Sequence, residues 1–403
     1  MDAFFAAVEE RDKPRFKGLP IVVCTSTRLS VHPSQDLTVE YEDKRDISRA
    51  NPEFGHSAEL SRSLEGWSAD PRGGRGRGVV STANYKAREY GIHSAMPISS
   101  AWRLSEAARR KGKPPAAFLG VDIRRYAQVS DAVMTILRAH VPVIEKASVD
   151  EAYLDMSFAG SYDKAEALAR KVKQEIKEKE RLTASVGIGP NKLIAKIASG
   201  TQKPDGLTVI YPELVQEFLD PLPIRAIPGI GPKTEELFGR KGVRSVGDLK
   251  RFEKEELHEM LGKWGATLYE KVHGRDESPV VEEYEAKSIG EQETFERDTR
   301  DPNFITARLS ALCRNVIRRL EADGFSAEGG SASGGKSFGR VVLTVRFADF
   351  ETKTKSHALP VPAASGKELE FEAMKLLLPF FDKRENPKGK LIRLIGARVE
   401  KLL

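Results

Sequence analysis

Short apolar runs of the strand type alternate with amphipathic helical patterns over much of the first half of the chain. Residues 143–157 are predicted to form two strands and residues 182–188 a third. Helical patterns cover residues 130–139, 163–179 and 192–199, with apolar side chains recurring on one face. Strands interleaved with helices in this order are typical of a mixed α+β domain.

Residues 25–78 interrupt this pattern. They are rich in Ser, Arg, Pro, Gly and Glu, show no sustained period, and end in an Arg/Gly run. Such a stretch cannot bury enough apolar surface to offset the entropy lost on ordering, so we interpret it as a disordered insertion. An Arg/Gly run is more often a solvated linker than a nucleic-acid contact.

The second half of the chain divides into two further regions. Residues 211–280 are predicted to be helical with short loops, and residues 281–287 to form a linker. Residues 288–403 predict the element order β-α-β-β-α-β, with a Gly/Ser-rich loop after the first helix. These elements are expected near Ile289 and over residues 302–322, 340–348, 353–359, 367–382 and 391–399.

Composition narrows the class of protein. The chain has 403 residues, enough for about two to four domains. Lys and Arg total 65 against 59 for Asp and Glu, an excess that permits a polyanionic partner without identifying one. The two cysteines imply no disulfide framework, and neither a secretion signal nor a membrane span is recognisable. We expect a soluble intracellular protein with no membrane partner.

Asp150 and Glu151 are adjacent acidic residues between apolar strand patterns. Neighbours on a regular strand point to opposite faces, so both carboxylates reach one site only where a strand bends or ends. By itself such a pair is more often an exposed loop pair than a metal site. Its surroundings decide between the two interpretations.

Two segments far apart in the sequence carry a resemblance to a known family. Residues 148–155 (SVDEAYLD) match the motif S-x-D-E-A-Y-L-D, and residues 1–5 (MDAFF) match the second part of V-D-x-D-x-F-F. These are the catalytic motifs of the Y-family, the translesion DNA polymerases, and the chain most closely resembles its DNA polymerase kappa and bacterial DNA polymerase IV branch. The resemblance implies low-fidelity, template-directed addition of deoxynucleotides to a primer 3′ end during DNA repair and damage tolerance.

The resemblance also implies an α+β multidomain fold with the architecture of a right-hand polymerase. The implied domains are a palm (1–18 and 115–210), small fingers (19–114, including the insertion 25–78), a helix-hairpin-helix thumb (211–280), a linker (281–287) and a β-α-β-β-α-β little finger (288–403).

The same resemblance makes Asp150 and Glu151 catalytic ligands of two Mg²⁺ ions, for which Mn²⁺ is a substitute. Phosphoryl transfer by two metals needs oxygen ligands of this kind. Aligning Phe4 and Phe5 with the family's paired aromatics makes Asp2 the second Asp of the motif, which is not the principal ligand. The first Asp then precedes Met1, so we expect a truncated sequence.

Two rival functions stay open at this point. One is a catalytically impaired relative that binds DNA as a scaffold, because the first metal-binding Asp precedes Met1. The other is a helix-hairpin-helix repair nuclease, which requires an acidic cluster of its own within residues 211–280. We find no such cluster with convincing spacing.

The nucleotide pocket is expected to be formed by residues from three segments. Phe5 resembles the family's steric gate, a ring that excludes a 2′ hydroxyl. Phe4 beside it is assigned to the nucleotide-binding residues as well, with an ordinary core aromatic as the preferred interpretation. The i, i+3, i+6 spacing within residues 82–88 predicts one helical face that meets the triphosphate. That face is formed by Thr82, Tyr85 and Arg88. Lys203 matches the family lysine that reaches the triphosphate.

DNA contacts are expected in two places. Residues 227–234 carry a helix-hairpin-helix signature, in which Gly229 and Gly231 let backbone amides approach a phosphate next to Lys233. In the last domain, polar residues alternate with apolar ones along two strands. Arg346, Lys353 and Lys355 are expected on one basic sheet face that contacts the duplex; a merely solvated face is the alternative.

The expected partners are primer-template DNA and deoxynucleoside triphosphates, with a sliding clamp left open. Residues 376–381 are similar to the aromatic pair of a clamp peptide, but they lack the upstream Gln and fall in a predicted core helix. We interpret them as core. The insertion favours a eukaryotic source and hence the nucleus; otherwise the cytoplasm is expected.

Overall fold

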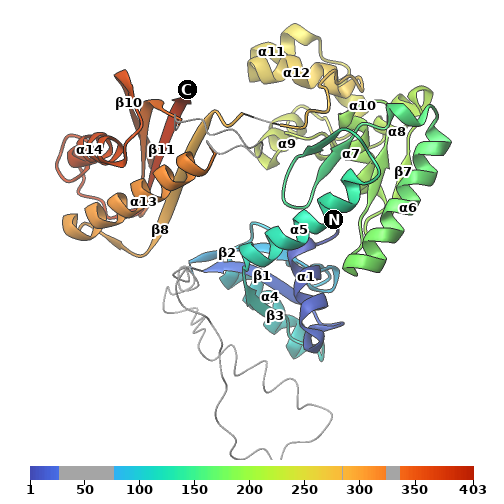
Figure 1. Ribbon diagram of the computed structural model, residues 1–403, viewed down its shortest axis with the longest axis horizontal. Coiled ribbons are helices and arrows are strands. Elements are labelled where there is room, and N and C mark those ends of the chain that lie inside the picture. The colour runs from blue at the N-terminus through green and yellow to red at the C-terminus, as the bar shows by residue number, and fades with distance from the viewer. Residues whose placement is uncertain (27–76, 284, 324–335) are drawn as a thin grey trace, which may run out of the picture. The chain divides into compact units, whose positions relative to one another are not determined.

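The computed structural model describes residues 1–26, 77–283, 285–323 and 336–403. Most of the predicted insertion and of the Gly/Ser-rich loop therefore lies outside the described residues. The chain forms two compact units, which meet in the sequence at residues 283 and 284. Figure 1 colours the N-terminal unit blue to yellow and the C-terminal unit orange to red.

The first sheet of the N-terminal unit has the order β2-β1-β3. Its strands are β1 (Ile21–Ser26), β2 (Gly78–Ala83) and β3 (Ala117–Gly120), and β1 pairs with β3 in parallel. Helix α4 (Ile98–Arg110) and the short helix α3 (Tyr85–Arg88) contribute to the same apolar core. The buried run at residues 21–24 explains why a strand forms there, because such a run suits a strand covered on both faces.

The centre of the N-terminal unit combines helices with two short strand pairs. Strands β4 (Ile144–Lys146) and β5 (Ala152–Leu154) are antiparallel, and β6 (Val186–Ile188) and β7 (Leu207–Val209) are parallel. The helices are α1 (Phe4–Asp12), α5 (Ile123–Arg138), α6 (Tyr162–Glu180) and α7 (Lys192–Thr201). This interleaving confirms the predicted α+β class, although α5 begins seven residues before the predicted 130–139 helix, where Asp122 caps it.

Residues 211–280 are helical, as predicted. The helices are α8 (Val215–Leu219), α9 (Pro232–Gly239), α10 (Val246–Leu249), α11 (Lys254–Leu261) and α12 (Lys263–Val272). Their apolar side chains share one core with residues of α7. Gly229 adopts a φ of +106°, and a Cβ there would lie 3.0 Å from the indole of Trp264, so this turn requires glycine.

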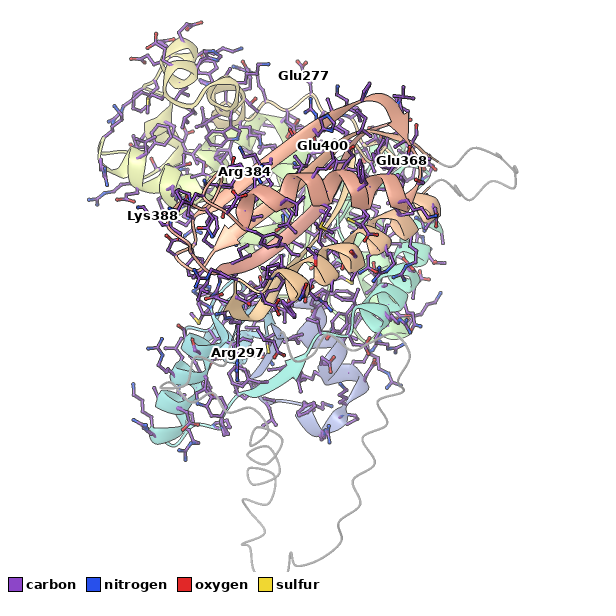
Figure 2. All side chains as sticks on the ribbon, turned by 90° about the vertical axis from the view of Figure 1, so that its left-hand side faces the viewer. Glu277, Arg297, Glu368, Arg384, Lys388 and Glu400 are labelled. Atoms are coloured by element: carbon purple, nitrogen blue, oxygen red, sulfur yellow. The ribbon has the colours of Figure 1, made fainter. Side chains whose placement is uncertain are left out.

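The C-terminal unit confirms the predicted order β-α-β-β-α-β. Its elements are β8 (Ser288–Thr299), α13 (Pro302–Asp323), β9 (Phe338–Phe347), β10 (Thr352–Ala363), α14 (Gly366–Leu377) and β11 (Ile392–Leu402). The strands form one antiparallel sheet in the order β10-β9-β11-β8. Figure 2 shows the two helices packed over one face of this sheet, with Glu368 at the start of α14.

Helix α14 ends before the predicted residue 382, because Pro379 supplies no backbone N–H and a 3₁₀ turn follows at Leu378–Phe380. Leu377 and Phe380 are buried in the core of the unit, consistent with the interpretation of residues 376–381 as core. Within the described ranges, we find no helix that combines the length and the apolar character needed to cross a membrane.

Candidate active site

Asp150 and Glu151 lie in a tight turn between β4 and β5. The backbone nitrogens of Ala147 and Ser148 both donate to the carbonyl oxygen of Glu151, at 3.0 and 3.1 Å. The hydroxyl of Ser148 donates to Oδ1 of Asp150 at 2.8 Å. The strands therefore end at the acidic pair, which is the condition under which adjacent carboxylates can serve one site.

Two lysines of α7 surround this turn. Lys196 forms an ion pair with Glu151, and the ammonium of Lys192 lies 4.8 Å from the centroid of the Tyr153 ring. Burial raises the pKa of Glu151, but the hydrogen bond and charge of Lys196, together with the charge of Lys203, lower that pKa by more. The net result is a Glu151 pKa below its ordinary value, so the carboxylate is ionised at neutral pH.

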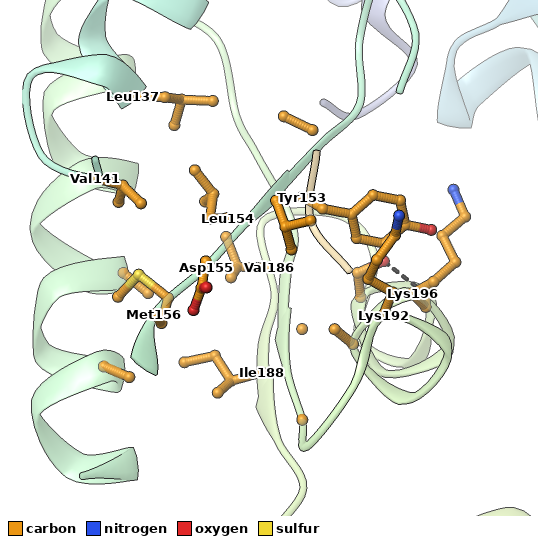
Figure 3. Close-up of a pocket in the computed structure, with 18 of the residues that line it drawn as sticks. Leu137, Val141, Tyr153, Leu154, Asp155, Met156, Val186, Ile188, Lys192 and Lys196 are labelled. Atoms are coloured by element: carbon orange, nitrogen blue, oxygen red, sulfur yellow. Dashed lines mark hydrogen bonds between the residues drawn. The ribbon is translucent and has the colours of Figure 1, made fainter. Parts of the chain in front are cut away.

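The acidic turn opens into a cavity of about 640 Å³. Asp150, Glu151, Lys196 and Lys203 all contribute to its lining. Figure 3 shows Lys192 and Lys196 on the Tyr153 side of this cavity, with apolar side chains on the opposite side. Carboxylates and ammonium groups thus share one concave site, the kind of site that holds a charged ligand.

The acidic pair fits divalent metal ions. Magnesium is usually bound by one or two carboxylates together with substrate phosphates and waters, and Asp150 and Glu151 supply two carboxylates. In the described residues no group of three or more His, Cys, Asp or Glu side chains forms a further metal cluster. The amino nitrogen of Met1 lies 2.6 Å from the carbonyl oxygen of Asp150, so a residue placed before Met1 would stand beside the pair.

The two N-terminal aromatics have different environments. Phe4 is 2% exposed and belongs to the central core, as interpreted from the sequence. Phe5 is only partly buried and stacks on Tyr126 of α5. A partly exposed ring on a rigid support is the geometry that a steric gate requires.

The predicted helical face of Thr82, Tyr85 and Arg88 is wrong in one respect. Thr82 lies on β2, and the helix begins only after Asn84, whose side chain accepts a hydrogen bond from Ala87 N. An Asn cap holds its own backbone extended, so the residues before it cannot continue the helix. Tyr85 and Arg88 do share α3, and the guanidinium of Arg88 lies 4.7 Å from the centroid of the Tyr85 ring.

Lys203 lies in the exposed loop between α7 and β7 and lines the same cavity as the acidic turn. The sequence did not predict how this loop is held. The side chain of Asp2 accepts a hydrogen bond from the backbone N–H of Asp205 in this loop, although the two residues are 203 positions apart in the sequence. No local pattern could have revealed that contact.

The helix-hairpin-helix residues lie where the motif predicts. Gly229 is in the turn before α9, Gly231 caps that helix with an extended backbone, and Lys233 lies in its first turn. A Cβ added at Gly231 would meet no atom within 4 Å, so the space in front of the helix start is open. Open backbone amides at a helix start suit a phosphate.

The prediction that Lys353 and Lys355 share a face with Arg346 is wrong. In the β9–β10 register Lys353 pairs with Val345 and Lys355 with Leu343, and both partners are buried under the helices. Directly paired residues point to the same side of a sheet, so the two lysines lie on the helix side, where both bond to Glu385.

Arg346 lies on the opposite, open face of the sheet. The registers place Arg340 and Arg398 on that face as well, where both pair with Glu400. These two arginines were not predicted from the sequence, although Arg340 follows the same alternation as Arg346. Arginine side chains, rather than the predicted lysines, therefore make the open face basic.

The chain matches known proteins along most of its length. Residues 1–200 match the impB/mucB/samB family, residues 286–403 match the C-terminal domain of that family, and residues 212–243 match its helix-hairpin-helix motif. DNA polymerase IV 2 of Methanosarcina mazei is 38% identical over 403 residues, covering 100% of this chain and 90% of that protein. The chain belongs to the Y-family DNA polymerases. It is a DNA-directed DNA polymerase of the DNA polymerase IV kind, which acts in translesion synthesis.

Other Y-family proteins extend the comparison. DNA polymerase IV of Halorhodospira halophila is 35% identical over 406 residues, covering 100% of this chain and 93% of that protein. The Y-family DNA polymerase chimera Dbh-Dpo4(243-245)-Dbh superposes with a TM-score of 0.73 at 28% identity, and the insertion ternary complex of Dbh DNA polymerase with 0.60 at 28%. Each comparison covers 100% of this chain and 97% of the other.

The named sequence relatives come from prokaryotes. The expectation of a nuclear protein therefore finds no support among these Y-family members. Both relatives are named as DNA polymerases, and the match covers at least 90% of each of them. The interpretation of this chain as a catalytically impaired scaffold therefore finds no support in these comparisons. Membership in the family confirms the resemblance on which the polymerase prediction rested.

Proposed function

We propose that Asp150 and Glu151 hold the divalent metal ions with which this polymerase joins a deoxynucleotide to a primer 3′ end. One observation carries this assignment: the turn at residues 147–151 brings both carboxylates to a cavity that Lys196 and Lys203 also line. Bound Mg²⁺, or Mn²⁺ in its place, stabilises the charge that develops on the phosphoryl oxygens and polarises the attacking hydroxyl.

The chain's own residues select and orient the nucleotide. The Phe5 ring, held against Tyr126, excludes a 2′ hydroxyl from the sugar position. Tyr85 and Arg88 on α3, together with Lys203, contact the triphosphate. Thr82, near the end of β2, adds a hydroxyl two residues before the cap of that helix.

Primer-template DNA is bound through its backbone in both units. Gly229, Gly231 and Lys233 offer amides and a cation to a phosphate, which gives binding that does not depend on sequence. On the C-terminal unit the open sheet face with Arg346 supplies further cations. The solved ternary complex of Dbh, a protein of the same fold, supports a site that takes DNA and nucleotide together.

The test separates chemistry from binding. Asp150→Asn and Glu151→Gln, made separately, are each expected to abolish Mg²⁺-dependent primer extension while the affinity for primer-template, measured by fluorescence anisotropy, stays within about twofold. Asp163→Asn on the exposed side of α6 is the matched control and keeps both activities. Loss of DNA binding in the two active-site variants would show that the carboxylates are structural instead.

A further inference from the structure

Asp2 is a buried carboxylate that joins the segment carrying Lys203 to the segment at residues 183–185. Its side chain is 4% exposed. Oδ1 accepts a hydrogen bond from the Ser185 hydroxyl at 2.8 Å, and Oδ2 accepts one from the backbone N–H of Asp205 at 2.8 Å. The backbone nitrogen of Asp2 donates to Thr183 O at 3.1 Å, so the whole residue is fixed against the segment that leads into β6.

The Lys203 loop is short and is held from several sides. Ser185 Oγ, the partner of Asp2, also accepts a hydrogen bond from Gly206 N at 3.3 Å. Lys173 of α6 donates to the carbonyl oxygens of Asp205 and Gly206 at 2.7 and 2.8 Å, and it pairs with the Asp205 carboxylate at 3.0 Å. Three side chains therefore anchor the loop: Lys173 satisfies two of its carbonyl oxygens, Asp2 the N–H of Asp205, and Ser185 the N–H of Gly206.

The charge of Asp2 also acts on Tyr85, a residue of the proposed nucleotide pocket. The hydroxyl of Tyr85 is buried and, among the described residues, finds no partner with hydrogen-bond geometry. Burial raises the pKa of Tyr85 and the charge of Asp2 raises it further, while the charge of Arg88 and the polar contact it makes lower it.

We propose that Asp2 is a positioning residue for the incoming nucleotide, which holds the Lys203 loop through Asp205 N–H and Ser185 so that the Lys203 ammonium meets the triphosphate. Each carboxylate oxygen of Asp2 accepts a hydrogen bond from a protein donor, so the side chain is oriented toward the loop and Ser185. This inference rests on the proposed function, because it acts through the triphosphate contact assigned there to Lys203.

The first test measures nucleotide binding rather than turnover. Affinity for dATP is titrated on the chain bound to primer-template, with a 2-aminopurine reporter in the template and Mg²⁺ present. Asp2→Asn keeps the shape but turns an amide toward an N–H donor, so the loop loses one charge-assisted bond. The Kd for dATP is expected to rise roughly tenfold, while DNA affinity and the midpoint of thermal unfolding change little.

A double-mutant cycle shows whether Asp2 acts through Lys203. Lys203→Ala alone weakens dATP binding, and adding Asp2→Asn to it is expected to cost nothing more. In extension assays the single Asp2 variant should raise KM for the nucleotide with kcat nearly unchanged, and its Mg²⁺ requirement should not move. Additive losses, or a dATP affinity that Asp2→Asn leaves unchanged, would overturn the proposal.

Two further variants keep the outcome interpretable. If Asp2→Asn does not fold, Ser185→Ala removes only one of the two bonds to Asp2 and should still raise the Kd for dATP roughly threefold; an unchanged Kd then counts against the proposal. Asp163→Asn is the matched control and leaves the Kd unchanged. Absence of dATP binding in the unaltered chain would instead contradict the proposed function.

Discussion

The ring of Phe5 lies flat against the ring of Tyr126, with centroids 4.2 Å apart and planes inclined by 14°. Tyr126 is fully buried, and its hydroxyl donates to Oε1 of Glu9 at 2.7 Å. Glu9 is itself buried and pairs with Lys13 at 2.6 Å. The partly exposed ring of Phe5 is therefore backed by a ring whose position a buried polar contact fixes.

Removing the Phe5 ring should open the sugar site to ribonucleotides. Phe5→Ala leaves room for a 2′ hydroxyl, so discrimination against ribonucleotides is expected to fall roughly 100-fold. The measurement is the ratio of kcat/KM for a deoxynucleotide and the matching ribonucleotide. Phe4→Leu, a change in the core beside it, should lower stability but keep that ratio. Unchanged sugar discrimination in Phe5→Ala would refute the gate assignment.

Removing the Tyr126 hydroxyl should cost stability rather than selectivity. Tyr126→Phe retains the stacked ring but leaves one oxygen of buried Glu9 without its donor, at a cost of about 1–3 kcal/mol in the free energy of unfolding. Denaturant titration measures this cost. Tyr90→Phe removes an exposed hydroxyl bonded to Pro114 O and is expected to cost less. Equal effects of the two changes would contradict the prediction.

The sequence predicted which segments form helices and strands more reliably than it predicted the side of the sheet to which each residue points. The alternation at residues 340–347 was sufficient to place β9, because a half-buried strand repeats with period two. It could not place Lys353 and Lys355, since the side to which a second strand points depends on its register with the first. The turn at residues 348–351 sets that register, and a slip of one residue reverses every side chain.

The candidate site residues show a similar limit: local contacts could be predicted from the sequence, and long-range contacts could not. Asp150 and Glu151 were found because the whole motif is contiguous, and the turn that unites them is local. Asp2 was assigned by alignment alone, and its partners Ser185 and Asp205 lie 183 and 203 residues away. Contacts of that range follow from tertiary packing, which no local pattern encodes. The start of α3 was misplaced because the capping role of Asn84 was overlooked.

Asp12 should make the N-terminal unit sensitive to acid. The hydrogen bond from Arg125 lowers the pKa of Asp12 to about 2 against the opposing effect of burial, and Arg11 adds to this lowering. A depressed folded-state pKa stabilises the fold above the unfolded value of 3.8, and that stabilisation is lost as the pH falls through about 2. After allowance for solvent screening it amounts to about 1 kcal/mol.

Asp12→Asn is therefore expected to unfold more easily than the unaltered chain at pH 7, with the difference shrinking between about pH 4 and pH 2. Thermal midpoints measured across this range give the comparison. Asp131→Asn, which removes an exposed partner of Lys146, serves as the control with no such trend. A difference that stays constant with pH would show that Asp12 contributes through packing alone.

Lys233 should contribute to DNA affinity without contributing to sequence preference. Lys233→Ala removes one phosphate contact, so binding is expected to weaken equally for unrelated duplex sequences, and the slope of log K against log salt should fall by about 1. Anisotropy titrations at several salt concentrations measure both quantities. Lys179→Ala, which removes a cation paired with Glu175 on α6, should leave the slope unchanged. A sequence-dependent loss would indicate base contacts instead.

A carboxylate placed before Met1 should strengthen the metal site. The amino nitrogen of Met1 lies beside Asp150, so the dipeptide Val-Asp added in front of Met1 brings a third carboxylate to the acidic turn. Each added oxygen ligand favours a divalent cation over water, and extension should therefore saturate at a lower Mg²⁺ concentration. The matched control adds Val-Asn, which has the same length and shape without the charge. Identical Mg²⁺ titrations for the two extended chains would show that this position does not reach the metal ions held by Asp150 and Glu151.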